Sequence, residues 1–204
     1  MGIKFNNKDL KKLMKNVDQK KNGSLSGVFE KKETEAQRQL KGAIEKLKNP
    51  LKEDKIFLNE DATKCVIYLK DATLLSNNIS LRLGAKQMSE YKKLWHQRIK
   101  DLVKPSILKK WGNIEDKKFF IEFCYEVNCN HMDYDGKVSA FKAPLDGLTK
   151  ANLIKDDNEK HLSMILAKQR RSKSKIPNLI IMISLETDPD RYFSDDFKDF
   201  LETV

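Results

Sequence analysis

Two pairs of aspartates stand on either side of one helix-like segment of the sequence. Asp133 and Asp135 are separated by one residue, and Asp156 and Asp157 are adjacent. Between the two pairs, apolar residues recur at the spacing of one helix face; they are Val138, Phe141, Leu145 and Leu148. The polar side of the same helix carries Ser139, Lys142, Asp146 and Lys150. The pattern predicts a strand, a turn, a helix, a second turn and a strand, with acids at both turns.

These acids are able to form a metal site if the strands bring them together. If Asp133 and Asp135 end one strand, they point to the same face, and Asp157, just before the next strand, can meet them at one sheet edge. Carboxylates this close repel one another and need a cation. Mg²⁺ suits them, with Mn²⁺ as a substitute, because it takes oxygen ligands and keeps positions for water and phosphate. Such an ion activates water for attack on a phosphodiester, and Lys142 is placed to hold the scissile phosphate.

Each acid pair also has a purely structural interpretation. Asp-x-Asp-Gly is an ordinary turn, and Asp-Asp is an ordinary cap. For one pair alone the structural interpretation is the more frequent one. The two pairs together, around one helix that carries Lys142, favour the metal site.

The order of these residues resembles that of the RusA-type Holliday-junction resolvases, a family of crossover junction endodeoxyribonucleases. The matching residues are Asp133-Tyr134-Asp135, Lys142-Ala143-Pro144-Leu145-Asp146-Gly147-Leu148 and Asp156-Asp157, together with a loop, Leu74-Leu75-Ser76-Asn77-Asn78, that is similar to the loop after the family's first strand. The resemblance covers residues 64–185. Members of the family are dimeric, Mg²⁺-dependent enzymes that cut branched DNA.

The resemblance implies a role for each matching residue. Metal ligation falls to Asp133, Asp135 and Asp157, the essential lysine is Lys142, and Asp146 and Asp156 have supporting roles. The sequence departs from the family pattern at Gly136, at Asn152 and in a longer gap between Asp135 and Lys142. These departures leave every expected ligand in place.

The charge of the chain points to an anionic partner. The 204 residues include 40 Lys and Arg against 30 Asp and Glu, a net charge of +10, which favours nucleic acid, although a solvated lysine-rich surface explains the charge equally well. The basic run from Lys168 to Lys175 connects two expected strands and predicts a hairpin tip that contacts a DNA backbone. The candidate DNA contacts are Asn77, Asn78, Arg82, Lys137, Lys150, Lys168, Arg170, Arg171, Lys173 and Lys175.

The periodicity of the chain predicts a mixed α/β (α+β) fold, with a mixed β-sheet flanked by helices. Strands are expected at 65–69, 119–127, 162–167 and 179–185, and helices at 8–20, 33–48 and 87–103, with a break from 104 to 116. Pro144 predicts a bend or a late start of the helix between the acid pairs. The expected division is a basic helical extension at 1–61, a nuclease domain at 62–187 and an acidic C-terminal helix at 188–204.

Several other classes of protein fit poorly. Three cysteines make no disulfide framework, and Cys124, Cys129 and His131 lack a fourth zinc ligand, so we expect reduced thiols. No segment has the length of a membrane helix or the apolar core of a signal peptide, which predicts a cytoplasmic protein.

The resulting hypothesis is a Mg²⁺-dependent, structure-selective endonuclease that resolves four-way junctions or related branched DNA. We expect it to act as a homodimer, without a membrane and without a small-molecule cofactor. Two alternatives remain open at this point. One is a nuclease of the same fold that cuts flaps or forks, and the other is a DNA-binding or regulatory protein that does not cut.

Overall fold

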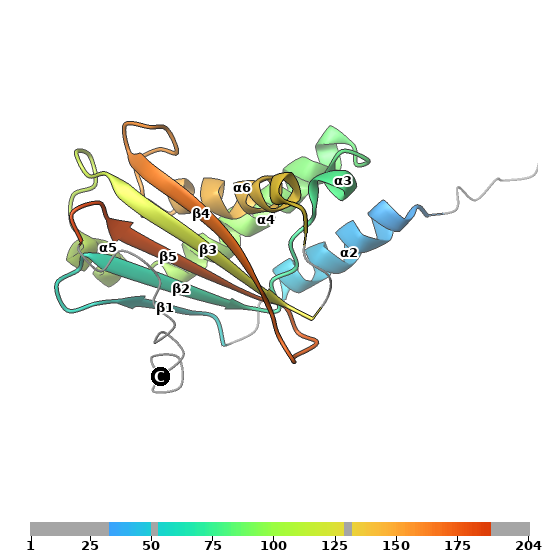
Figure 1. Cartoon of the computed structure of the whole chain (residues 1–204), viewed down its shortest axis with the longest axis horizontal. Helices are drawn as coiled ribbons and strands as arrows, with labels where there is room; N and C mark the ends of the chain where they lie inside the picture. Colours follow the sequence, from blue (N-terminus) through green and yellow to red (C-terminus); the bar gives the residue numbers. More distant parts are fainter. Residues whose placement is uncertain (1–32, 50–52, 129–131, 189–204) are drawn as a thin grey trace, which may run out of the picture. The chain divides into compact units, whose positions relative to one another are not determined.

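The computed structural model describes residues 33–49, 53–128 and 132–188. It confirms the mixed α/β class: five strands form one mixed sheet, and helices accompany it (Figure 1). The elements, in chain order, are α2 (Glu35–Lys48), β1 (Lys55–Leu58), β2 (Lys64–Lys70), α3 (Asn77–Ser80), α4 (Ala85–Leu102), α5 (Pro105–Trp111), β3 (Phe119–Val127), α6 (Tyr134–Lys150), β4 (Leu162–Arg171) and β5 (Asn178–Leu185).

The sheet has the strand order β1-β2-β5-β3-β4. Neighbouring strands are antiparallel except for β3 and β4, which run parallel. Parallel neighbours need a crossover connection, and α6 provides it between β3 and β4. This β3–α6–β4 unit holds both acid pairs, so its geometry decides whether the acids meet.

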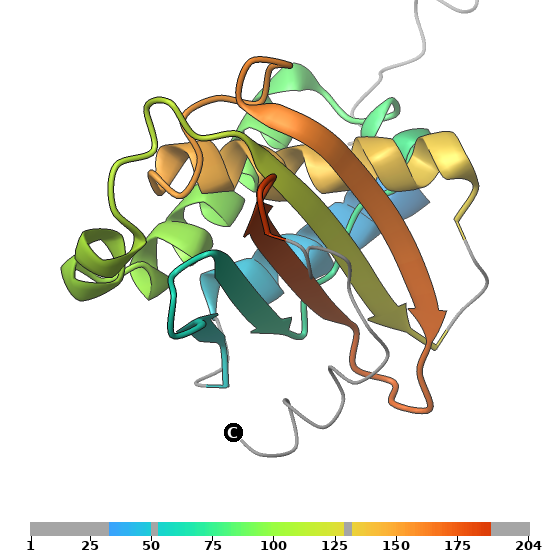
Figure 2. The same cartoon turned by 60° about the vertical axis from the view of Figure 1, so that its left-hand side comes forward.

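Helices α2, α4 and α6 lie on one face of the sheet (Figure 2). Alternate residues of the strands point to opposite faces: in β3, Ile121 and Phe123 join the main core beneath the helices, whereas Phe120 and Cys124 belong to a second apolar cluster. The other buried members of that second cluster are Val66, Ile180 and Met182. Within the described ranges, no helix is both long enough and apolar enough to cross a membrane.

Helix α5 occupies part of the expected break at 104–116, so that prediction was wrong there. Pro105 stands at the first turn of the helix, where its missing N–H costs nothing. Trp111 at its end is buried, and its indole N–H donates to the carbonyl oxygen of Leu153 at 2.9 Å. The helix is therefore held by a contact with a residue far along the chain.

The compact unit that contains the sheet begins at Thr34. Thr34 caps α2 through a capping box with Gln37, and the apolar face of α2 is buried in the core, as the helical spacing predicted. Strand β1 pairs with β2. Residues that we assigned by sequence to an extension at 1–61 thus supply a helix and an edge strand to the sheet unit. The expected helix at 8–20 lies outside the described residues, as does 189–204, which is nearly all of the expected C-terminal helix.

Two of the three cysteines are free and buried in strands. Burial raises the pKa of the Cys65 thiol to about 12 and that of Cys124 to about 11. Thiols with such pKa values stay protonated near neutral pH and are poor metal ligands or nucleophiles. Cys129 and His131 fall outside the described residues.

The packing of α6 on α4 depends on a glycine. A Cβ atom added at Gly147 would lie 2.7 Å from Cδ1 of the fully buried Ile99 and 3.5 Å from the carbonyl oxygen of Trp95. We therefore expect Gly147→Val to lower the free energy of unfolding by about 1–3 kcal/mol through overpacking, measured by urea denaturation. Gly42→Ala in α2 is the control, because an added Cβ there meets nothing within 4 Å and removing a helical glycine stabilises by about 0.5–1 kcal/mol. Equal effects of the two substitutions would contradict the close approach.

Candidate active site around Lys142

Asp133 caps helix α6. The helix begins at Tyr134, and the Asp133 Oδ1 atom accepts a hydrogen bond from the Gly136 backbone N–H at 3.0 Å. Strand β3 has already ended at Val127, so the expectation that Asp133 and Asp135 end a strand was wrong. The late start considered because of Pro144 is wrong, since the helix begins at Tyr134 and Pro144 lies inside it. In the first acid pair, Asp133 therefore has the structural role of a helix cap.

The parallel pairing of β3 and β4 separates the two acid pairs. Residues that follow the first strand of a crossover and residues that precede the second lie at opposite ends of the sheet. The Met132 backbone N–H donates to Gln169 in the second half of β4 at 2.9 Å, which fixes the start of α6 there. Asp157, by contrast, lies before the first residue of β4. The acids would meet at one edge only if the two strands were antiparallel.

This separation bears on the expected metal ligands. Lys142, which Asp157 contacts, lies seven residues after Asp135, a rise of about 10 Å along the helix axis. One Mg²⁺ ion holds its oxygen ligands at about 2.0–2.1 Å, so carboxylates that share an ion must lie close together. Among the described residues, no group of three or more Asp, Glu, His or Cys side chains is arranged to hold a metal. Asp133, Asp135 and Asp157 therefore do not form one ligand set as they lie.

Lys142 is instead the centre of a charged cluster. Its ammonium group contacts the Asp157 carboxylate and lies 2.9 Å from Asp146 Oδ1. Lys92 of α4 lies 3.7 Å from the other Asp146 oxygen. Asp156 shapes the turn, because its side chain accepts hydrogen bonds from the Asp157 backbone N–H at 2.8 Å and from Asn158 at 2.7 Å. The cluster thus joins two lysines and two aspartates from α4, α6 and the loop after α6.

Two members of the cluster, Lys142 and Asp157, keep their charges over a wide pH range. Partial burial by itself would lower the pKa of Lys142, but the hydrogen bonds to Asp157 and Asp146 outweigh it, and the net shift is upward from 10.5. The hydrogen bond from Lys142 lowers the pKa of Asp157 below its ordinary value of 3.8. Both shifts favour the ionised forms, so the pair is fully charged at neutral pH.

A polar contact links helix α6 to the loop after β2. The Ser139 hydroxyl donates to Asn77 Oδ1 at 3.3 Å, and Asn77 is the first residue of α3. Ser139 lies between Asp135 and Lys142 on one face of α6, as the helical spacing predicted. The Asn77 loop and the lysine motif, far apart in the sequence, therefore meet. Lys92 was not among the residues predicted for the site, since in the sequence it is one of several lysines on the polar side of α4.

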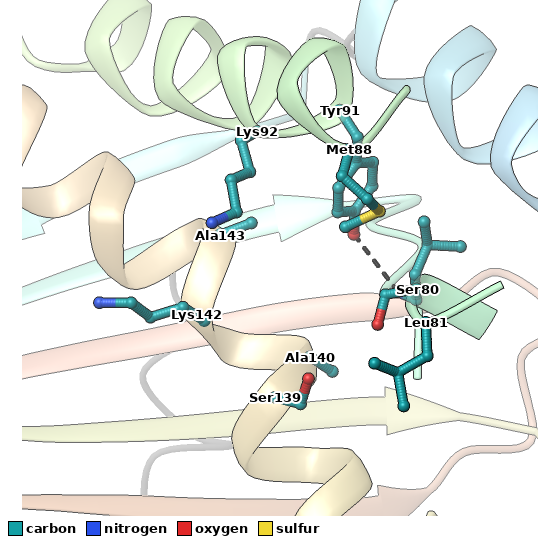
Figure 3. Close-up of a pocket in the computed structure, with 10 residues that line it drawn as sticks. Ser80, Leu81, Met88, Tyr91, Lys92, Ser139, Ala140, Lys142 and Ala143 are labelled. Carbon is teal, nitrogen blue, oxygen red and sulfur yellow. Dashed lines mark hydrogen bonds between the residues drawn. The ribbon is translucent and has the colours of Figure 1, made fainter. Parts of the chain in front are cut away.

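An open pocket adjoins this cluster between α3, α4 and α6 (Figure 3). Its volume is about 310 Å³. It is lined by Leu75, Ser80, Leu81, Met88, Tyr91, Lys92, Ser139, Ala140, Lys142 and Ala143. Lys92 and Lys142 belong to both the cluster and the pocket, so a molecule in the pocket lies against the charged cluster.

The expected basic hairpin is not present, and its prediction was wrong. Strand β4 continues to Arg171, so Lys168, Arg170 and Arg171 are strand residues. Strand β3 stands between β4 and β5 in the sheet. The segment that connects β4 to β5 therefore crosses over the end of β3. Lys168 also pairs with the buried Glu122 at 2.7 Å, so its charge is already compensated.

The remaining candidate DNA contacts are distributed over several elements. Asn78 and Arg82 are exposed in and after α3, Lys150 is exposed at the end of α6, and Lys137 is half-buried near its start. Lys173 and Lys175 are exposed in the connection between β4 and β5. The cluster around Lys142 is the more specific feature, because its contacts are defined.

The two roles considered for Asp133 are separable by substitution. Asp133→Ser keeps a good N-cap oxygen but removes the carboxylate, whereas Asp133→Ala removes both. If Asp133 serves as a cap, the alanine variant loses about 1 kcal/mol of unfolding free energy and the serine variant loses little, as measured by urea denaturation without metal. If the serine variant were as unstable as the alanine variant, the capping role would be refuted.

The site thus unites Asn77, Ser139, Lys142, Asp146 and Asp157, and leaves Asp133 and Asp135 at the start of α6. The resemblance to RusA-type resolvases stays a prediction, because the sequence matches no protein-family model and no curated protein.

Proposed function

We propose that this chain is a structure-selective endonuclease for branched DNA, of the RusA type, which acts in the cytoplasm as a homodimer. The observation that carries the proposal is the contact of Lys142 with Asp146 and Asp157, beside the Asn77–Ser139 hydrogen bond. Residues that the sequence motif singles out in three separate segments come together there. The net charge of +10 supports an anionic partner of this kind.

Lys142 supplies the charge that a phosphodiester needs. A phosphate that binds its ammonium group takes the place of one of its two carboxylate partners, and Lys92 lies close enough to Asp146 to share the compensating charge. A fixed cation beside the phosphate stabilises the negative charge that develops during cleavage. Asn77 and Ser139 offer polar atoms one turn away on the same side.

Mg²⁺ is part of the proposal through the resemblance, and when bound it would supply an activated water. The carboxylates as they lie do not form one ligand set. The same separation of the acids favours a second candidate function, a protein that binds branched DNA without cutting it.

The deciding experiment uses a synthetic four-way junction, a fork and a plain duplex, each with Mg²⁺, Mn²⁺ or EDTA. We expect paired nicks near the junction centre only with a divalent ion. Asp157→Asn should bind the junction without cutting it, while Asp101→Asn, an exposed aspartate of α4, should behave as the wild type. If the wild type binds the junction but cuts none of the three substrates with either ion, the binding protein replaces the enzyme. Equal affinity for junction and duplex, together with no cutting of any substrate, would refute both.

A further inference from the structure

The pocket between α3, α4 and α6 has an apolar floor and a flat wall. Leu75 and Tyr91 at its base are buried. The Tyr91 hydroxyl is already used, since it accepts from the Leu75 backbone N–H and donates to the Thr73 carbonyl oxygen, each at 3.3 Å. Ala140 and Ala143 lie one turn apart on α6, so the part of the wall that they form has short side chains. The surface that faces an incoming group is therefore apolar and smooth.

The opposite side of the pocket carries an apolar residue that the fold does not use. Leu81 is 76% exposed, an unusual position for a leucine beside an open pocket. Figure 3 shows Leu81 and Ser80 across the pocket from Ser139 and Ala140, with Met88 beside Tyr91 on the α4 side. Methionine is adaptable and polarisable and suits contact with a flat ring. A planar apolar group fits between these two sides.

The other end of the pocket is charged, with two lysines beside their aspartate partners. The ammonium groups of Lys92 and Lys142 both lie near Asp146, at 3.7 and 2.9 Å, and Figure 3 shows both pointing away from Leu81. A free phosphate would make no use of Leu81 and Met88, and a purely apolar ligand would make no use of the lysines. A group with a flat apolar part joined to an anion uses both ends.

We propose that this pocket holds one unstacked nucleobase of DNA, with the adjoining phosphate against Lys92 and Lys142. Unstacked bases bind to apolar and aromatic surfaces beside basic residues, with little dependence on sequence. The inference rests on the proposed function for the source of the base, because the strands of a branched DNA part at its centre and a base there costs least to extrude. It does not depend on cleavage.

The test measures binding in EDTA, so that cutting plays no part. A four-way junction with a single abasic nucleotide, placed in turn at each central position, is compared with the intact junction for the wild type and for Leu81→Ser. Stacking of one base contributes about tenfold in affinity. At one position, therefore, removal of the base should lower the affinity of the wild type for the junction about tenfold. The affinity of Leu81→Ser, which is already lower, should hardly change when the same base is removed. Such non-additivity is the mark of direct contact.

Matched variants separate the pocket from general surface effects. Met164→Ser on β4, 50% exposed and outside the pocket, should bind as the wild type does and show the full abasic loss. Ala143→Leu, which fills the pocket from the α6 side, should reproduce Leu81→Ser, provided that its unfolding transition is unchanged. If, at every position, the loss of affinity caused by the abasic nucleotide is the same for Leu81→Ser as for the wild type, the base pocket is refuted while the nuclease proposal stands. If the wild type binds no DNA at all, both fall.

Discussion

Lys142→Met is expected to slow the cutting of a four-way junction about 100- to 1,000-fold, the usual cost of removing one group that stabilises transition-state charge. Methionine keeps most of the length of the side chain and removes only the ammonium group. Asp157 then loses its contact with the ammonium group, and Asp146 keeps Lys92 at 3.7 Å as a compensating charge. The rate of cutting should therefore fall much more than the affinity for the junction.

The fold should tolerate this change. The Lys142 side chain is 49% exposed, and ion pairs at such positions contribute at most about 1 kcal/mol to stability. Lys93→Met, at an exposed lysine of α4, is the matched control and should cut at the wild-type rate. The measurement is the single-turnover rate with saturating protein, together with the dissociation constant in EDTA. A rate within a few fold of the wild type would remove Lys142 from the active site and leave its ion pairs a structural role.

Asp54→Ala should cause the largest loss of stability, about 3–5 kcal/mol of unfolding free energy. The Asp54 carboxylate accepts two hydrogen bonds from the Arg98 guanidinium, each at 2.8 Å, and one from the Lys70 backbone N–H at 2.9 Å. Arg98 also donates to the Lys70 carbonyl oxygen. The side chains of Arg98 and Asp54 are 1% and 5% exposed. Without Asp54, the guanidinium charge stays buried and unpaired, which is the costly case.

An exposed ion pair supplies the comparison for Asp54. Lys48 and Glu90 lie 3.1 Å apart with about half of each side chain exposed, so Glu90→Ala should cost less than about 1 kcal/mol. Both variants are measured by urea denaturation at neutral pH. A similar small loss in both would show that Arg98 finds another partner or reaches water when Asp54 is removed.

Local patterns in the sequence determined most of the secondary structure. The alternation of apolar residues predicted a strand at Phe119–Val127, and the structure has the same bounds. The alternation is informative because successive side chains of a strand point to opposite faces of the sheet. Asn152, shortly after α6, has a φ of 58°, a left-handed conformation that asparagine adopts at little cost. Helical spacing likewise predicted α2, α4 and α6, and the polar face of α6 that carries Ser139, Lys142 and Asp146.

Contacts between distant residues decided what the patterns left open. Helix α5 is too short to show a period, and the hydrogen bond from Trp111 to Leu153 holds it. Helix α2 belongs to the sheet unit because its apolar face is buried in the main core, and β1 belongs to it because it pairs with β2. Neither contact can be read from the local sequence. The partners of Lys142 also came from the fold, since Asp157 follows it by fifteen residues and Lys92 belongs to another helix.

The position of the acids shows this division most clearly. The sequence determined that two acid pairs flank one helix and that Lys142 lies between them. It did not determine the direction of the strand that follows, because the period of a strand is the same in parallel and antiparallel sheets. The parallel pairing of β3 with β4 places Asp133 and Asp135 at one end of α6 and leaves Asp157 beside Lys142. Only the tertiary structure decided that the three carboxylates stand apart, since strand direction is set by packing over the whole sheet.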